Sequence, residues 1–248
     1  MTCTIAAQSA LSIGEVHVWV ISLNDAHYTT DRFLPILSQE ERTRAESLYL
    51  ESDRVCFIRA HGIVRQILAS YSDVAASSLK FRANRFGKPF LVTDSGAPNI
   101  QFSVSHSGEF CLLALRLDCP VGIDLEKLRN VPDIKRISDR YFTSSEAGFL
   151  STLCGQPQRN AFFALWTHKE AMVKGLGLSL AANLRQIEFD FNSSHRPRLV
   201  SWARNTSITK EWSLRPLSPG PDYVAAVACK GPVRSFAVRQ WPDDADVS

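Results

Sequence analysis

The sequence predicts an α+β protein made of two similar α+β lobes related by a pseudo-twofold axis. Two observations lead to this class: runs of β-branched and aromatic residues alternate with stretches of helical periodicity, and the same order of elements begins again at Val121. We expect a first lobe over residues 1–119, a second lobe over 120–241 and a flexible tail over 242–248. A functional site is expected where the lobes meet, because pockets form preferentially at such junctions.

The first half is expected to open with a strand followed by two helices. Residues 16–21 are β-branched and aromatic, as in a strand, and Ser38 with the acidic residues after it predicts a capped helix start. A longer helix is expected over 53–69, because apolar residues recur there at helical spacing. Short strands follow over 79–81, 101–104 and 110–117, with the turn Gly87-Lys88-Pro89 between the first two.

The second half repeats this order. The expected elements are a strand over 121–125, a helix near 143–153, a longer helix over 159–176 and then further strands. Aligning Phe57 with Trp166 places Arg65 on Lys174, which supports a repeat, although two unrelated amphipathic helices can also align in this way by chance.

Charge and composition exclude several classes of function. The chain has 28 Lys and Arg against 25 Asp and Glu and no polycationic run, so nucleic-acid binding is not expected. Charged residues interrupt every apolar stretch, so we expect no membrane span. The six cysteines form no Cys-x-x-Cys pair, which indicates reduced thiols and a cytoplasmic location. Serine-nucleophile, P-loop and zinc chemistry are disfavoured, because their sequence motifs are absent.

Two acidic residues lie on one face of the strand that begins at Val121. Because side chains of a strand alternate, Asp124 and Glu126 point to one side, whereas Ile123 and Leu125 point into the core. Adjacent carboxylates repel each other unless they share a cation, and Mg²⁺ prefers carboxylate and water oxygens. A solvated strand edge is the alternative, and it is the commoner meaning of this pattern taken alone.

The helix expected over 159–176 supplies a third carboxylate. Glu170 follows Phe162 and Trp166 at four-residue steps, so it lies on a stripe that is otherwise largely apolar. A buried carboxylate on that stripe needs a partner. The alternative is an exposed pair between Glu170 and Lys174, but the aromatic residues on the same stripe favour burial.

Three sets of residues offer the kinds of donor that phosphate groups bind. They are Ser103, Ser105 and His106 at a strand end, Gly87 and Lys88 in the turn, and Arg44 and Arg65 on the first two helices. Each set has an ordinary alternative, because turn lysines are usually solvated and serines at strand ends commonly belong to loops.

In chain order, four segments together resemble the Sfp-type 4'-phosphopantetheinyl transferase family. They are Gly87-Lys88-Pro89, F-S-V-S-H-S-G over 102–108, G-I-D-L-E-K over 122–127 and W-T-H-K-E-A-M-V-K-G over 166–175, a W-x-x-K-E-A form of the family signature. The resemblance covers residues 38–180 and implies a monomer with two pseudo-symmetric lobes.

The resemblance implies a Mg²⁺-dependent transferase. Such an enzyme moves the 4'-phosphopantetheine moiety of coenzyme A to a serine of an apo acyl or peptidyl carrier protein and releases 3',5'-ADP. By resemblance, the metal ligands are Asp124, Glu126 and Glu170, and the catalytic residues are Glu170, as general base, with Lys174 and Asp124. The residues implied in coenzyme A binding are Arg44, Arg85, Gly87, Lys88, Ser103, Ser105, His106, Glu170 and Lys174.

Two other functions stay open on the residues alone. One is a Mg²⁺-dependent phosphoryl or phosphodiester hydrolase that uses the same three carboxylates. The other is a non-catalytic module that binds coenzyme A or a carrier protein. Carriers of fatty-acid, polyketide, nonribosomal-peptide and lysine pathways are all compatible with the resemblance.

Overall fold

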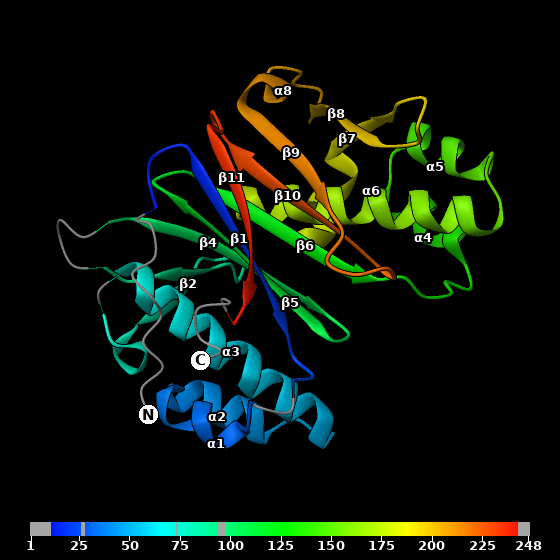
Figure 1. The fold of residues 1–248 in the computed structure, drawn as a ribbon. Coiled ribbons are helices and arrows are strands. Elements are labelled where there is room, and N and C mark those ends of the chain that lie inside the picture. The colour runs from blue at the N-terminus through cyan, green and yellow to red at the C-terminus, as the bar shows by residue number, and fades with distance from the viewer. Residues whose placement is uncertain (1–10, 26–27, 73, 94–97, 243–248) are drawn as a thin grey trace.

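The computed structural model describes residues 11–25, 28–72, 74–93 and 98–242, and positions 243–248 of the expected tail lie outside this part of the chain. The fold is mixed α+β, as the sequence predicts (Figure 1). The helices are α1 (Thr30–Phe33), α2 (Gln39–Glu46), α3 (Glu51–Ser72), α4 (Ile134–Tyr141), α5 (Ser144–Ser151), α6 (Gly155–Leu176), α7 (Leu180–Asn183) and α8 (Ile208–Glu211). The strands are β1 (Glu15–Ser22), β2 (Phe81–Ala83), β3 (Pro89–Leu91), β4 (Ile100–Ser107), β5 (Phe110–Leu117), β6 (Val121–Lys127), β7 (Ile187–Phe191), β8 (Pro197–Trp202), β9 (Trp212–Leu217), β10 (Tyr223–Lys230) and β11 (Ser235–Trp241).

The described strands form two larger sheets and two hairpins. The first sheet has the order β11-β1-β5-β4 and the second has the order β6-β10-β9, while β2 pairs with β3 and β7 with β8. All pairs are antiparallel except β1 with β11. Although β11 falls in the range expected for the second lobe, it completes the first sheet beside β1 (Figure 1), where it covers a strand edge that would otherwise be unpaired.

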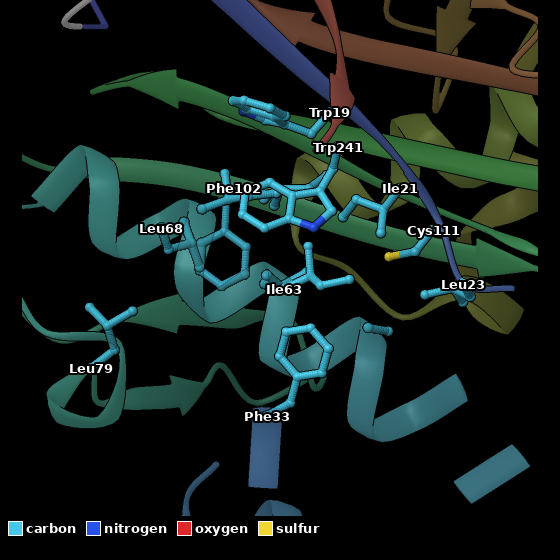
Figure 2. Packing of buried hydrophobic residues seen from close by; sticks show 14 of the residues in the cluster. Trp19, Ile21, Leu23, Phe33, Ile63, Leu68, Leu79, Phe102, Cys111 and Trp241 are labelled. Atoms are coloured by element: carbon cyan, nitrogen blue, oxygen red, sulfur yellow. The ribbon is translucent and has the colours of Figure 1, made fainter. Parts of the chain in front are cut away.

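The two sheets pack on each other, and each has a long helix on its other face. Residues of β1 alternate between two cores: Val18 and Val20 face the second sheet, whereas Trp19 and Ile21 pack with residues of α3. Figure 2 shows the core on the α3 side, where Ile63 lies among these side chains. Helix α6 packs on β6 and β10 on the opposite side of the molecule. The result is a layered structure in which the two packed sheets lie between α3 and α6.

The two halves repeat one order of elements. The series β1, α2, α3, hairpin β2-β3, β4 and β5 corresponds to β6, α5, α6, hairpin β7-β8, β9 and β10. Helices α2 and α5 both begin with a capping box, formed by Ser38 with Glu41 and by Thr143 with Glu146. Helices α3 and α6 have 22 residues each. The prediction of two similar α+β lobes is therefore confirmed.

The register of the repeat differs from the expected one. Arg65 lies 2.8 Å from the capping-box residue Glu41, and Lys169 lies 2.8 Å from its counterpart Glu146. Arg65 therefore corresponds to Lys169 and not to Lys174. The alignment of Phe57 with Trp166, which relied on apolar residues, was wrong. Apolar residues can replace one another at several positions of a helix face, whereas a buried carboxylate requires its cation at one position.

Most predicted boundaries agree with the structure to within a few residues. The strand over 110–117 is β5, and the long helices both begin earlier than expected. The strand expected over 79–81 is displaced to β2, because residues Ala76–Ser78 form a short 3-10 turn before it. Within the described ranges no helix is both long and apolar enough to cross a bilayer. The five cysteines in those ranges are free: Cys56, Cys111, Cys119, Cys154 and Cys229.

Candidate active site at the junction of the two lobes

Serine side chains join the two sheets where β4 lies beside β6. Three alternate serines of β4 accept hydrogen bonds from three alternate backbone N–H groups of β6: Ser103 from Ile123 (3.1 Å), Ser105 from Leu125 (3.2 Å) and Ser107 from Lys127 (3.0 Å). We call this row of contacts the serine seam. Because the seam uses side-chain oxygens, it holds the lobes together without a backbone ladder between the two strands.

Asp124 is buried at the serine seam, with 3% of its surface exposed. Its Oδ1 atom accepts a hydrogen bond from Ser105 Oγ at 2.9 Å and one from Lys174 Nζ at 2.5 Å. Its Oδ2 atom is buried and has no N–H or hydroxyl partner in the described part of the chain, and a hydrogen bond between the carboxyl groups of Asp124 and Glu170 contributes to the raised pKa of Glu170. An ionised carboxylate oxygen without a donor is costly in such a place, so this atom is the natural contact for a cation or a ligand proton.

Helix α6 brings Glu170 and Lys174 to the same place. Lys174 Nζ lies 3.7 Å from Glu170 Oε2, in addition to its contact with Asp124. The Glu170 side chain is only 14% exposed. Glu170 and Lys174 therefore do not form the exposed surface pair that was the alternative from the sequence. The ammonium group of Lys174 also contacts the carboxylate of Asp124 on β6.

Burial and like charge shift the pKa values of these carboxyl groups. Burial, followed by the negative charge of Asp124, raises the pKa of Glu170 to about 7. Burial also raises the pKa of Asp124, while the ammonium group of Lys174 acts in the opposite direction. A carboxyl group that titrates near neutral pH is suited to accepting a proton from a substrate.

Glu126, the third carboxylate, is held by a different cation. Its Oε2 atom lies 2.7 Å from Arg129 NH1, and its side chain is 20% exposed. Among the described residues, Asp124, Glu126 and Glu170 do not converge into a set that could hold a metal ion without rearrangement. The physical reason is that Lys174 and Arg129 neutralise these carboxylates in the structure. The alternation expected from the strand is confirmed, since Ile123 and Leu125 are buried on its other face.

The hydroxyl groups of Ser103 and Ser105, expected near the nucleotide, are engaged within the protein. Both residues are buried, and both hydroxyls accept backbone N–H groups of β6. Ser105 Oγ also lies 3.1 Å from Lys174 Nζ. The structure therefore brings Ser105 into the carboxylate site, whereas Ser103 belongs to the serine seam.

The turn that contains Gly87 and Lys88 lies against the second lobe. Lys88 Nζ donates to the backbone carbonyls of Val121 at 3.0 Å and Gly175 at 3.3 Å. Burial lowers the pKa of Lys88 to about 8. A cavity of about 320 Å³ adjoins this lysine, and its walls include Phe102 of β4. Lys88 is thus fixed at the lobe junction instead of being a solvated turn lysine.

The remaining expected contacts lie toward the surface. Gly87 is exposed and has a φ of 88°, which suits glycine in a tight turn. Arg85 is exposed and its guanidinium lies over the ring of Phe86, and Arg44 is exposed on α2. His106 is also exposed, but partial desolvation, followed by the charges of His61 and Lys174, lowers its pKa.

Arg65 does not serve as a phosphate ligand. It is 2% exposed, binds Glu41, and donates through NH1 to the carbonyls of Ala76 and Leu79. The guanidinium group predicted to bind phosphate is thus used to hold the end of α2 on α3. Sequence reasoning also missed Arg129 as the partner of Glu126, although its position three residues later was a usable signal.

The chain is similar in sequence to known proteins over most of its length. Sequence models match residues 120–228 as "4'-phosphopantetheinyl transferase superfamily" and residues 26–117 as "4'-phosphopantetheinyl transferase, N-terminal". The 4'-phosphopantetheinyl transferase HetI of Nostoc sp. is 33% identical over 217 residues, which are 88% of each chain. The chain belongs to the 4'-phosphopantetheinyl transferase superfamily.

Further members of the superfamily are similar over large parts of the chain. The 4'-phosphopantetheinyl transferase Sfp of Bacillus subtilis is 28% identical and covers 67% of this chain and 76% of its own. A solved holo-(acyl-carrier-protein) synthase from Bacillus anthracis, in complex with CoA (3',5'-ADP), is 18% identical, with a TM-score of 0.38 over 46% of this chain and 96% of that chain.

Proposed function

We propose that this protein transfers the 4'-phosphopantetheine moiety of coenzyme A to a serine of an apo carrier protein and releases 3',5'-ADP. The observation that carries the proposal is the contact of one ammonium group, Lys174 Nζ, with the carboxyl groups of both Asp124 and Glu170 at the lobe junction. The relatives HetI and Sfp are 4'-phosphopantetheinyl transferases, which supports the proposal, and α6 supplies both Glu170 and Lys174 to the site.

The oxygen donors of the site residues are of the type that suits a Mg²⁺ ion, and the three carboxylates would have to rearrange to bind it together. Asp124 Oδ2 is buried without an N–H or hydroxyl donor among the described residues, and burial, followed by the negative charge of Asp124, raises the pKa of Glu170. Asp124, Glu126 and Glu170 would hold the ion, and their oxygen donors are the type that Mg²⁺ prefers. When bound, the ion would neutralise charge on the diphosphate of coenzyme A and on the leaving 3',5'-ADP.

Glu170 and Lys174 divide the chemical work. The serine oxygen of the carrier protein forms a bond to the phosphorus nearest the pantetheine, and the bond from that phosphorus to the oxygen of 3',5'-ADP breaks. Glu170 takes the serine proton, directly or through a water molecule, since its carboxyl group titrates near pH 7. Lys174 would move from Asp124 to the phosphate oxygens and hold the negative charge of the leaving group there.

The nucleotide would lie along the first lobe, beside the turn and the end of β4. We propose that Lys88, Gly87 and Arg85 contact the adenosine 3'-phosphate end, with His106 close to the phosphates and Arg44 at the periphery. The proximity of His106 to Lys174 supports this orientation of the nucleotide, with the diphosphate near Lys174 and the adenosine near the turn. Ser103 is not kept in this set, because its hydroxyl is buried in the serine seam.

The acceptor would be an acidic carrier domain, which the net charge of +3 would attract weakly. We also propose that the protein acts as a cytoplasmic monomer, which the free, scattered cysteines and the internal repeat support. Sedimentation of the purified protein would show the mass of one chain.

The deciding experiment mixes the protein with coenzyme A, Mg²⁺ and a panel of apo carrier proteins. Mass spectrometry should show the 4'-phosphopantetheine arm on a serine of at least one carrier, and the reaction should stop with EDTA and resume with added Mg²⁺. A hydrolase would instead consume coenzyme A without a carrier. A binding module would modify no carrier, and Glu170→Ala would leave its binding unchanged.

A further inference from the structure

Ser105 has a set of contacts that defines where its proton goes. Its Oγ atom lies 3.2 Å from the backbone nitrogen of Leu125, 3.1 Å from Lys174 Nζ and 2.9 Å from Asp124 Oδ1. A backbone N–H and an ammonium group can only donate, so both must use the lone pairs of the hydroxyl. The single hydroxyl proton of Ser105 is therefore directed at Asp124 Oδ1.

This arrangement distinguishes the two oxygens of Asp124. Oδ1 accepts from both Ser105 and Lys174, whereas Oδ2 is buried and accepts from no N–H, ammonium or hydroxyl group among the described residues. A carboxylate with two donors on one oxygen cannot rotate without losing both bonds. The orientation that exposes Oδ2 to the site is thus maintained by the serine even if Lys174 moves to a ligand.

We propose that Ser105 is a positioning residue, which orients Asp124 so that Oδ2 faces the divalent cation. This inference rests on the proposed function, because that function supplies the divalent cation. The contacts of Ser105 with Asp124 do not depend on which carrier is modified. Ser105 acts through Asp124 and does not itself contact the cation. Hydrogen bonds of this kind to metal-ligating groups commonly account for ten- to hundredfold in metal affinity or activity.

Ser103 provides a matched control on the same strand. It is buried to a similar extent, at 5% against 6% exposure for Ser105, and it accepts a backbone N–H of β6 at a similar distance. The β6 residue that corresponds to Asp124 at the Ser103 position is Gly122, which has no side chain. Ser103→Ala therefore removes the same seam contact and leaves the carboxylate untouched.

The test measures Mn²⁺ binding, by electron paramagnetic resonance, to the full chain without coenzyme A. Mn²⁺ replaces Mg²⁺ at oxygen sites and reports directly on them. We expect Ser105→Ala to weaken Mn²⁺ binding by about ten- to hundredfold, whereas Ser103→Ala binds as the wild type does. Each alanine variant loses one seam hydrogen bond, and Ser105→Ala also loses its contacts with Asp124 and Lys174, so Ser105→Ala should lower the denaturation midpoint further than Ser103→Ala does.

Ser105→Thr keeps the hydroxyl group and should keep the Mn²⁺ affinity, which provides a second comparison if Ser105→Ala fails to fold. Equal Mn²⁺ affinities for the two alanine variants, a loss in Ser105→Thr as large as in Ser105→Ala, or no Mn²⁺ binding by the wild type would overturn the proposal. Failure of the proposed function has a different signature, since the wild type would then modify no carrier while the difference between the serine variants in Mn²⁺ binding persisted.

Discussion

The ammonium group of Lys169 lies 2.8 Å from Glu146 Oε2, and neither side chain has any exposed surface. Lys169 also donates to the backbone carbonyls of Leu184 and Ile187, at 2.7 and 2.5 Å. This residue is the lysine of the signature segment and precedes Glu170 directly. Its role in the structure is to fix α6 on α5 and on the chain that follows α6, and so to set where Glu170 enters the lobe junction.

Loss of this cation should strongly destabilise the protein. Lys169→Met leaves the carboxylate of Glu146 buried without its partner, which typically costs roughly 3–5 kcal/mol. We expect this decrease in the free energy of unfolding, measured by urea denaturation. The double variant Lys169→Met with Glu146→Gln removes the stranded charge but keeps an oxygen that can accept from Phe189, so it should recover part of the loss. A single variant within about 1 kcal/mol of wild type would contradict the assignment.

The contact between β6 and α6 depends on a missing side chain. A Cβ atom at Gly122 would lie 2.0 Å from the carbonyl oxygen of Ala171 and 2.3 Å from the nitrogen of Gly175, both backbone atoms that cannot turn aside. Gly122→Ala should therefore destabilise the protein by about 3 kcal/mol or more. Thermal unfolding measures this loss, and a melting temperature equal to that of wild type would show that the helix does not pack this closely.

Gly148→Ala is the matched control for that substitution. Gly148 lies inside α5, and apart from its chain neighbours and the nearby helix backbone no atom of the described residues comes within 4 Å of the position its Cβ would take. Alanine favours a helix interior over glycine by roughly 0.5–1 kcal/mol. The same thermal measurement should therefore show a small stabilisation at this position.

Glu41 makes folding stability depend on pH in the acid range. Burial alone would raise its pKa, but hydrogen bonds from His61, from the backbone of Ser38 and from Arg65 outweigh burial and lower the pKa to about 2. The folded value lies below the unfolded value of 4.5, so the unfolded state binds more protons between these limits. The stabilisation is complete above pH 4.5 and disappears as the pH falls toward 2.

The measurable consequence is about 3 kcal/mol of unfolding free energy lost over that interval. Glu41→Gln should be less stable than wild type at neutral pH, and its stability should vary less with pH between 4.5 and 2. Denaturation curves taken across this range compare the two proteins. Parallel pH profiles for wild type and variant would rule out this assignment.

Lys174 should be needed for turnover more than for folding. Lys174→Ala removes one of the two side-chain groups that donate to Asp124 Oδ1 among the described residues, and with it the cation that would hold the leaving group. Removing one such electrostatic contact typically lowers kcat by about 10²- to 10³-fold. Steady-state transfer to a carrier protein measures this change, with circular dichroism as the check on folding. A decrease of less than about tenfold would place the leaving group elsewhere.

Local patterns were sufficient to predict much of the fold and part of the site. The alternation that separates Asp124 from Ile123 and the helical spacing that places Glu170 beside Lys174 both follow from short-range geometry. The functions of Ser105 and Arg65 were not predictable in this way. Each forms hydrogen bonds with residues at least 11 positions away in the chain, and such contacts depend on how complete elements meet.

The amino-acid sequence by itself determined which segments become strands and helices and which of their faces are apolar. It also determined that the acidic and basic residues occur in the chain order of the family signature. These properties depend on neighbours within one or two turns or pleats. Only the tertiary structure decided which cation neutralises which carboxylate, and that one oxygen of Asp124 is buried without an N–H or hydroxyl donor among the described residues. Asp124 and Lys174 are 50 positions apart, and they meet because β4, β6 and α6 pack at one junction, where burial makes every unpaired charge costly.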